Sequence, residues 1–222
     1  MSAEFDSSRL TIVDHPLVQR KLHILRDEAT GTNQFRALVR ELAIFEGYEA
    51  MRDFPLEDVE VKTPLETATC KRIAGKKVAI VPILRAGLGM VDGILELVPS
   101  ARVGHVGMYR GPQTHEPHPY YCKLPSDVGN RTCLVVDPML ATGGSLIAAI
   151  GELRRAGVRD VRALTLVSAP EGVAAVLDAD PNVRLFTCAL DRCLNENAYI
   201  LPGLGDAGDR IFGTLQRPSI AS

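Results

Sequence analysis

A segment near the middle of the chain reads Cys133-Leu134-Val135-Val136-Asp137-Pro138-Met139-Leu140-Ala141-Thr142-Gly143-Gly144-Ser145. It runs from an apolar, β-branched stretch through an acidic turn into a Thr-Gly-Gly-Ser loop, and a helical pattern begins at Leu146. This order predicts a strand, a loop and the N-terminus of a helix, whose unpaired backbone N–H groups suit a phosphate. Asp137 would follow the strand at its carboxyl end, where ligands of open α/β sheets bind.

The same loop residues are also compatible with ordinary turn chemistry and a helix N-cap that binds no ligand. A P-loop is excluded, because Leu146 stands where a P-loop has its lysine. A G-x-G-x-x-G pattern does not follow the strand, which argues against a dinucleotide-binding fold. The segment therefore indicates either a phosphate loop of another kind or a simple turn.

Length and composition indicate one globular α/β domain over residues 1–222. A hydrophobic share of 46% is enough for a packed core. The net charge of −2 gives no general attraction to nucleic acid or to an anionic membrane. The five cysteines form no C-x-x-C pair, and neither a signal pattern nor a membrane span is apparent. We expect a soluble, cytoplasmic protein with reduced thiols.

Two helical patterns precede the first buried strand. Residues 15–28 carry apolar side chains at near-helical spacing, and residues 32–45 do so more clearly, with Thr32 as the expected N-cap. Both helices are expected beside the sheet, either packed on its core or forming a dimerisation surface.

Strands and helices then alternate, which predicts a mainly parallel, doubly wound sheet. A short edge strand is expected over residues 59–62, between two prolines. The apolar runs typical of buried strands are residues 78–84, 101–109, 133–136, 163–168 and 183–190. Helical patterns cover residues 90–98, 146–155 and 171–177.

Two segments interrupt this alternation. Residues 111–130 contain four prolines and predict either a flexible functional loop or a β-hairpin arm. The run His115-Glu116-Pro117-His118 within it does not favour a metal site, because its proline breaks the helical register. Residues 191–210 are rich in Gly and Asp, so their backbone groups need partners, either a planar heterocycle or solvent and neighbouring loops.

Four motifs together resemble the type I phosphoribosyltransferases, in the form found in the uracil phosphoribosyltransferase family. They are Val136–Ser145, Pro82–Met90, Gly107–Arg110 and Pro202–Asp209. The resemblance extends in order from about His15 to Thr214. One departure is Ala198, where the family usually has a glycine. The resemblance implies the type I phosphoribosyltransferase fold, with N-terminal helices, a β-arm or flexible loop, and a C-terminal hood over residues 191–210 that binds the base.

The resemblance also implies the site residues. Those implied for phosphoribosyl pyrophosphate (PRPP) are Arg85, Arg110, Asp137, Pro138, Met139, Leu140, Ala141, Thr142, Gly143, Gly144, Ser145 and Asp206. Those implied for uracil are Tyr199, Ile200, Gly205, Asp206 and Ala207. The implied catalytic residues are Asp137, Arg110 and Asp206.

The implied reaction converts uracil and PRPP to UMP and diphosphate, in pyrimidine salvage. Mg²⁺ would be the cofactor, held mainly by PRPP rather than by protein ligands. Members of this family assemble as homo-oligomers, dimers or larger, and GTP activates some of them, which makes GTP a further candidate partner.

Two other functions compete with this interpretation. A regulatory protein of the same fold that senses nucleotides or binds RNA would need a basic face, which the charge pattern does not indicate. A transferase for another base is the second, and the loop 205–208 favours uracil by resemblance alone. The sequence assigns no general base for N1 of uracil.

Overall fold

The computed structural model describes residues 5–75, 78–110 and 117–214. Its centre is a nine-stranded sheet with the order β1-β11-β10-β8-β4-β6-β7, with β5 beside β4 and β9 beside β10. The strands of this sheet are β1 (Leu10–Ile12), β4 (Val78–Leu84), β5 (Arg102–Val103), β6 (His105–Arg110), β7 (Pro117–Lys123), β8 (Thr132–Val136), β9 (Met139–Leu140), β10 (Val161–Ser168) and β11 (Arg184–Leu190).

The pairings of this sheet within the described residues are parallel, apart from the antiparallel pair β6–β7. Strands β4, β8 and β10 are buried almost throughout, as expected for near-continuous apolar runs covered on both faces. The predicted α/β class and mainly parallel sheet are therefore confirmed.

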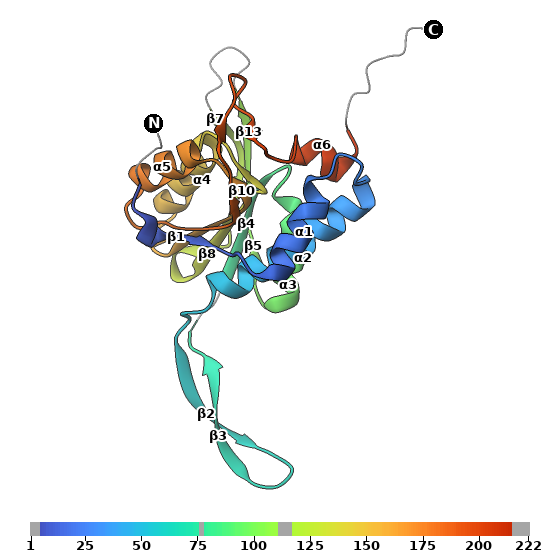
Figure 1. The fold of residues 1–222 in the computed structure, drawn as a ribbon. Coiled ribbons are helices and arrows are strands. Elements are labelled where there is room, and N and C mark those ends of the chain that lie inside the picture. Colours follow the sequence, from blue (N-terminus) through green and yellow to red (C-terminus); the bar gives the residue numbers. More distant parts are fainter. Residues whose placement is uncertain (1–4, 76–77, 111–116, 215–222) are drawn as a thin grey trace.

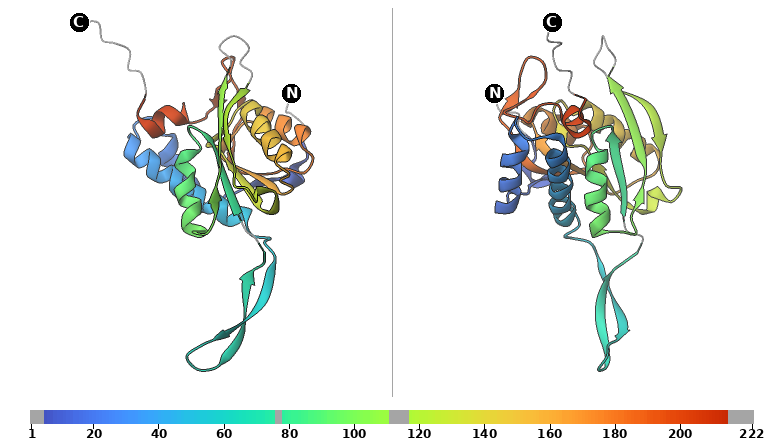
Figure 2. Two further views of the ribbon diagram at one scale, coloured as in Figure 1. Left: turned by 180° about the vertical axis from the view of Figure 1, so that it is seen from behind. Right: turned by 90° about the vertical axis from the view of Figure 1, so that its right-hand side faces the viewer.

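Helices cover both faces of the sheet (Figures 1 and 2). One face carries α1 (Pro16–Arg26), α2 (Thr32–Ala50) and α3 (Leu88–Leu97), and the other carries α4 (Gly144–Arg155) and α5 (Pro170–Ala179). The remaining helical elements are α6 (Ala207–Phe212) and the short 3-10 turns η1 (Ser7–Arg9) and η2 (Val128–Asn130). In the described residues, no helix combines the length and the apolar character needed to cross a membrane.

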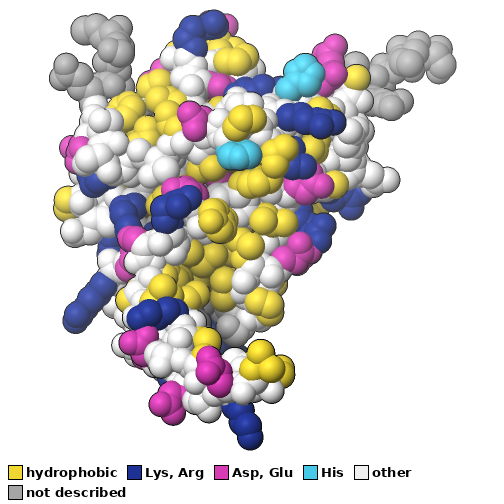
Figure 3. Space-filling model, turned by 60° about the horizontal axis from the view of Figure 1, so that its bottom comes forward, with side chains coloured by type: hydrophobic (Ala, Val, Ile, Leu, Met, Phe, Trp, Pro, Cys, Tyr) yellow, Lys and Arg dark blue, Asp and Glu magenta, His cyan; other side chains and the backbone are white. Residues whose placement is uncertain are grey.

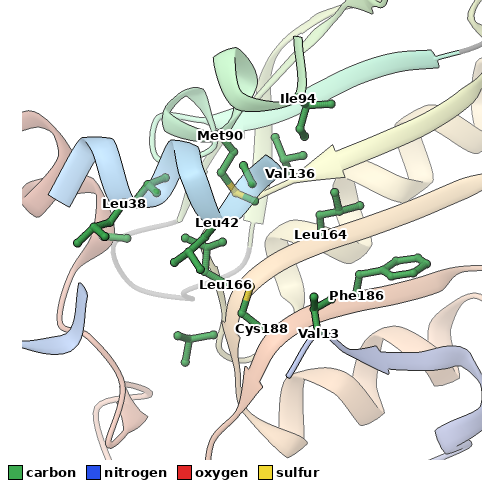
Figure 4. Close-up of a cluster of buried hydrophobic side chains, with 14 of the residues drawn as sticks. Val13, Leu38, Leu42, Met90, Ile94, Val136, Leu164, Leu166, Phe186 and Cys188 are labelled. Atoms are coloured by element: carbon green, nitrogen blue, oxygen red, sulfur yellow. The ribbon is translucent and has the colours of Figure 1, made fainter. Parts of the chain in front are cut away.

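Each face of the sheet has its own apolar core. Figure 4 shows the first, where Leu42 of α2 and Met90 of α3 lie between these helices and the strands β8 and β10. The predicted helical spacing of apolar residues in α2 is thus used for core packing. The N-cap of α2 is Gly31 rather than the expected Thr32, which is the first helical residue.

The expected edge strand over residues 59–62 is wrong in length and in place. The chain forms β2 (Leu56–Lys62), which pairs with β3 (Thr67–Ile73) in a separate antiparallel ribbon. This ribbon, hereafter the arm, stands away from the body of the protein (Figure 1). Neither strand has a buried face, so the alternation that normally reveals a strand in the sequence is absent.

Two further boundaries differ from expectation. The run 101–109 is divided at Gly104, where a Cβ would lie 2.9 Å from the Leu124 side chain and would disturb the packing. In the insertion 111–130, residues 117–123 form β7 and so correspond to the hairpin alternative, whereas residues 111–116 lie outside the described residues.

Glu46 of α2 is a completely buried carboxyl group within the core beneath β11. Cys188 Sγ lies 3.4 Å from its Oε1, and Oε2 has no hydrogen-bond partner among the described residues. Burial raises the pKa of Glu46 well above its ordinary value, and the contact with Cys188 only partly opposes this shift.

Replacement of this carboxyl group is expected to stabilise the protein. Because folding raises the pKa of Glu46, the folded state binds the carboxyl proton more tightly than the unfolded state does. The resulting contribution to the free energy of unfolding is complete below the unfolded-state pKa of about 4.3, and it is lost as the pH rises toward the folded-state pKa. Glu46→Met should therefore raise the free energy of unfolding at pH 8 by ~2 kcal/mol, and by less at pH 5.

Urea unfolding at the two pH values measures this difference. Glu41→Met is the matched control on the same helix, because the Glu41 carboxylate is 42% exposed and pairs with Lys21. An equal or lower stability of Glu46→Met at pH 8 would show that burial of Glu46 is not costly.

Candidate active site

A pocket of about 480 Å³ opens at the carboxyl edge of β4 and β8. Loops from three distant parts of the sequence line it. Its lining residues are Ile83, Leu84, Arg85, Ala86, Met108, Asp137, Met139, Ala141, Ser145, Asn197, Ala198, Tyr199, Gly205, Asp206, Ala207 and Gly208. Each of the four motifs singled out in the sequence contributes to this set.

The loop between β8 and α4 is fastened to the neighbouring strand β10. Asp137 directly follows β8, is half-buried, and donates its N–H to Leu164 O at 3.2 Å. Pro138 O accepts from Leu166 N at 3.0 Å, and Leu140 O accepts from Ala169 N at 2.8 Å. The Asp137 carboxylate is thus carried on a backbone with little freedom, at the mouth of the pocket.

The N-terminus of α4 follows this loop. Its N-cap is Gly143, with φ of 88°, a left-handed conformation that favours glycine. The helix begins at Gly144, two residues earlier than its apolar pattern at Leu146, and Ser145 lies inside the first turn. No side chain caps this end among the described residues, so the first-turn N–H groups face outward as they do in anion sites.

Two close backbone approaches fix the walls of the pocket. A Cβ on Gly172 of α5 would lie 2.2 Å from Ala141 O, so α5 packs directly against the β8–α4 loop. A Cβ on Gly87, in the turn after β4, would lie 2.3 Å from Val136 O at the end of β8. The turn after β4 therefore lies in contact with the strand that carries Asp137.

Arg85 belongs to this β4–α3 turn and is exposed. Its guanidinium carbon lies 5.8 Å from the centre of the Phe212 ring. Its Nη2 is 4.0 Å from the position of a Cβ on Gly208, next to Asp206. The cation therefore stands between the turn and α6, on the rim of the pocket. The Leu84–Arg85 peptide bond is cis, as is Leu201–Pro202.

Residues 191–210, hereafter the hood, form the remaining side of the pocket. It contains the hairpin of β12 (Cys193–Leu194) and β13 (Ile200–Leu201), which ends in an irregular loop before α6. Asp206 is the N-cap of α6, and its Oδ1 accepts from Asp209 N at 2.9 Å. Asp206 thus has a structural contact as well as a place on the pocket wall.

Ala198 lies at the tip of the hood hairpin and has φ of 60°. It is the non-glycine residue with positive φ in the part of the chain that the structure describes. Glycine adopts this conformation without strain, so the one departure noted from the resemblance lies at a strained backbone position.

Most of the sequence-predicted side chains meet at this pocket. Arg85, Asp137, Met139, Ala141, Ser145, Tyr199, Gly205, Asp206 and Ala207 line it. Pro138, Leu140, Thr142, Gly143, Gly144 and Ile200 lie in the same loops behind or beside the wall. Arg110 ends β6, but its side chain lies outside what the structure describes, as do the side chains of residues 115–118.

Other lining residues were not assigned from the sequence. Ala86, Met108 and Gly208 belong to motifs quoted above, so their motifs carried the signal although no role was given to them. Asn197 carries no such signal, because only the hairpin of the hood brings it to the pocket. The described residues hold no cluster of three or more His, Cys, Asp or Glu side chains suited to a metal ion.

Comparison with known proteins gives a consistent result. The family model "Uracil phosphoribosyltransferase" matches residues 12–214. The chain is 58% identical to the uracil phosphoribosyltransferase of Symbiobacterium thermophilum over 93% of its own length and 99% of the relative's. It is 57% identical to the same enzyme of Ligilactobacillus salivarius, again over 93% and 99% of the two chains.

A solved protein structure from Aquifex aeolicus has the same fold. It superimposes with a TM-score of 0.88 at 36% identity, over 94% of this chain and 100% of the other. The α/β fold and the order of its motifs are those of the type I phosphoribosyltransferases. By its sequence over residues 12–214 and by its fold, the chain belongs to the uracil phosphoribosyltransferase family.

Proposed function

We propose that this protein transfers the phosphoribosyl group of PRPP to N1 of uracil and releases diphosphate, as a step of pyrimidine salvage. The observation that carries the proposal is the pocket itself. Asp137, the glycine-capped start of α4 and the hood backbone all face this one pocket. Membership of the family supports the choice of substrates.

The β8–α4 loop is proposed to bind the ribose phosphate of PRPP. Backbone N–H groups from Ala141 to Ser145 would hold the 5-phosphate, since the cap at Gly143 leaves them without a side-chain acceptor in the described structure. The Asp137 carboxylate would accept hydrogen bonds from the ribose hydroxyls. Its anchored backbone keeps the sugar at a fixed distance from the phosphate.

Two arginines are proposed for the diphosphate. Arg85 stands on the pocket rim, and Arg110 closes the strand that leads into the Pro-rich insertion. A guanidinium fork matches two phosphate oxygens and stays charged at every relevant pH. These groups would stabilise the negative charge that develops on the leaving diphosphate.

Backbone groups of the hood are proposed to read the base. Uracil presents O4 as an acceptor, N3–H as a donor and O2 as an acceptor, so a rigid loop can complement it with N–H, C=O and N–H. Ile200 and the loop Gly205–Ala207 supply such groups, with Tyr199 beside them. Cytosine would leave buried groups unpaired, and sites built on hydrogen bonds reject such analogues strongly.

The chemistry then rests on positioning and charge. Departure of diphosphate would leave positive charge on the sugar, close to the carboxylates of Asp137 and Asp206. Uracil N1 would then attack C1′ from the opposite face, and the N1 proton would leave to solvent as the N1–C1′ bond forms. This sequence needs no covalent intermediate with the protein. Asp206 is limited in its movement by the cap that it forms on α6.

Mg²⁺ is proposed as the cofactor, held mainly by the substrate. Two pocket carboxylates, those of Asp137 and Asp206, are the hard oxygen ligands that Mg²⁺ takes together with phosphate oxygens. When bound, the ion would neutralise charge on the diphosphate.

We also propose that the protein assembles as a homo-oligomer through the arm. A two-stranded ribbon is marginal on its own in water, and its ion pairs Lys71–Asp58 and Arg72–Glu57 are exposed. Leu65 at its tip is 96% exposed. Apolar side chains gather on the face from which the arm projects (Figure 3), so a second copy could cover both.

The proposed reaction is tested by substrate choice. With Mg²⁺ and PRPP, diphosphate release is expected with uracil and not with cytosine, orotate, hypoxanthine or adenine, because only uracil matches the hood backbone. A failure to turn over uracil, with turnover of another base, would assign the protein to a different substrate.

Two further expectations have their own tests. GTP added to the same assay tests whether it activates the enzyme. Cell fractionation tests the expected cytoplasmic location.

Asp137→Asn tests the role given to the carboxylate. The variant keeps the shape of the side chain but removes its negative charge, so kcat should fall by about 100-fold while the KM for uracil changes little. Asp178→Asn, on the exposed side of α5, is the control and should leave kcat unchanged. An unchanged kcat in Asp137→Asn would show that the charge does not act on the reacting sugar.

Leu65→Glu tests the oligomer. A charge at the tip of the arm should weaken association by roughly tenfold or more, because the tip would have to be buried against another copy. Sedimentation velocity over a range of concentrations measures the change. Glu66→Gln, the neighbouring residue, serves as control. A monomeric unaltered protein at all concentrations would refute the proposed assembly.

A further inference from the structure

The part of the hood that follows Leu201 has an irregular backbone. Gly203 and Gly205 both take left-handed conformations, with φ of 64° and 80°. The groups proposed to read the base are carried on this loop, so their directions depend on how the loop is held. In the structure, the polar groups of Gly203 and the carbonyl of Leu204 are bound by charged side chains.

Gly203 is held on both sides by one ion pair. Arg26, at the end of α1, binds Asp191 with both nitrogens of its fork, at 2.8 Å from Nη1 to Oδ2 and 2.6 Å from Nη2 to Oδ1. Arg26 Nη1 also donates to Gly203 O at 2.7 Å, and Gly203 N donates to Asp191 Oδ2 at 2.8 Å. The Asp191 side chain is only 5% exposed and that of Arg26 24%, so the carboxylate side of this ring of hydrogen bonds is shielded from water.

Leu204 is held by a second arginine. Arg210 of α6 donates from Nη1 to Leu204 O at 2.8 Å and from Nη2 to Asp27 O at 2.5 Å. Its guanidinium lies 4.3 Å from the centre of the Phe35 ring. Burial lowers the pKa of Arg210, but an arginine stays protonated in proteins. The residue therefore ties the hood to the turn after α1 and to α2.

The two contacts fall on consecutive residues, immediately before Gly205. Gly203 and Leu204 are buried, whereas Gly205 and Asp206 are exposed toward the pocket. Gly203 and Leu204 are thus fixed by side chains of α1 and α6, and Gly205 and Asp206 face the pocket. Arg26 and Arg210 do not line the pocket.

We propose that the Arg26–Asp191 pair and Arg210 are positioning residues for base recognition, which set the direction of the hood backbone that reads uracil. This inference rests on the proposed function. It places part of the specificity of the site in residues that never touch the base.

A matched control exists elsewhere in the chain. Arg154 of α4 also binds Asp180 through two nitrogens, Nε at 2.7 Å and Nη2 at 3.0 Å, and donates from Nη1 to the carbonyls of Val158 and Arg159. Its partner Asp180 is 12% exposed. This pair has the same chemistry as Arg26–Asp191, but it ties the end of α4 to the end of α5, away from the hood.

The test compares Arg26→Lys and Arg210→Lys with Arg154→Lys. Lysine keeps the charge but loses the fork. In Arg26→Lys and Arg210→Lys, the KM for uracil should rise by about tenfold, whereas kcat and the KM for PRPP should stay within roughly twofold. Arg154→Lys should lower the thermal midpoint without changing the KM for uracil.

Asp191→Asn is the milder variant if Arg26→Lys does not fold. It keeps an oxygen for Gly203 N but removes the charge that orients Arg26, so the KM for uracil should rise in the same direction. If the Arg26, Asp191 and Arg210 variants fold and leave the KM for uracil unchanged, or change both KM values equally, the inference alone is contradicted. Absence of turnover with uracil in the unaltered protein contradicts the proposed function and the inference with it.

Discussion

The close contact between neighbouring βα turns is the constraint on which the pocket depends. Gly87 lies against Val136 O, and Gly172 lies against Ala141 O, at separations that leave no room for a Cβ. Parallel strands bring their carboxyl ends to one edge of the sheet, but this alone leaves loops free to spread. The backbone contacts bring the turn after β4, the β8–α4 loop and the start of α5 together. The position of Asp137 relative to Arg85 follows from this packing.

The hood is held in place in a different way. It closes the pocket without belonging to the sheet, and its loop has few regular backbone partners, so its peptide groups require other ones. Arg26 of α1, Asp191 directly after β11 and Arg210 of α6 provide them, and the burial of Asp191 strengthens the hydrogen bonds that it makes itself. The backbone groups that would bind the base therefore depend for their direction on the side chains that hold the loop from behind.

The sequence was most informative where burial is complete. Strands such as β4 and β10 were predictable because both faces are covered. The β8–α4 loop was predictable because its glycines stand between a buried apolar run and a helical pattern. The arm was misjudged because neither of its strands has a buried face in one copy of the chain. Arg26 was missed because it ends an amphipathic helix, where arginine normally faces solvent, and its partner Gly203 is 177 residues away.

The strain at Ala198 shows how such a loop tolerates a departure from its usual residue. A left-handed alanine costs about 1 kcal/mol relative to glycine. Hydrogen bonds to the Asn195 side chain offset this cost. Its Oδ1 accepts from Asn197 N at 3.0 Å and from Tyr199 N at 2.9 Å, on either side of Ala198. Ala198 N itself donates to Asn195 O at 2.9 Å. Since hydrogen bonds fix the turn on both sides of Ala198, the residue is held in the conformation that glycine would take freely.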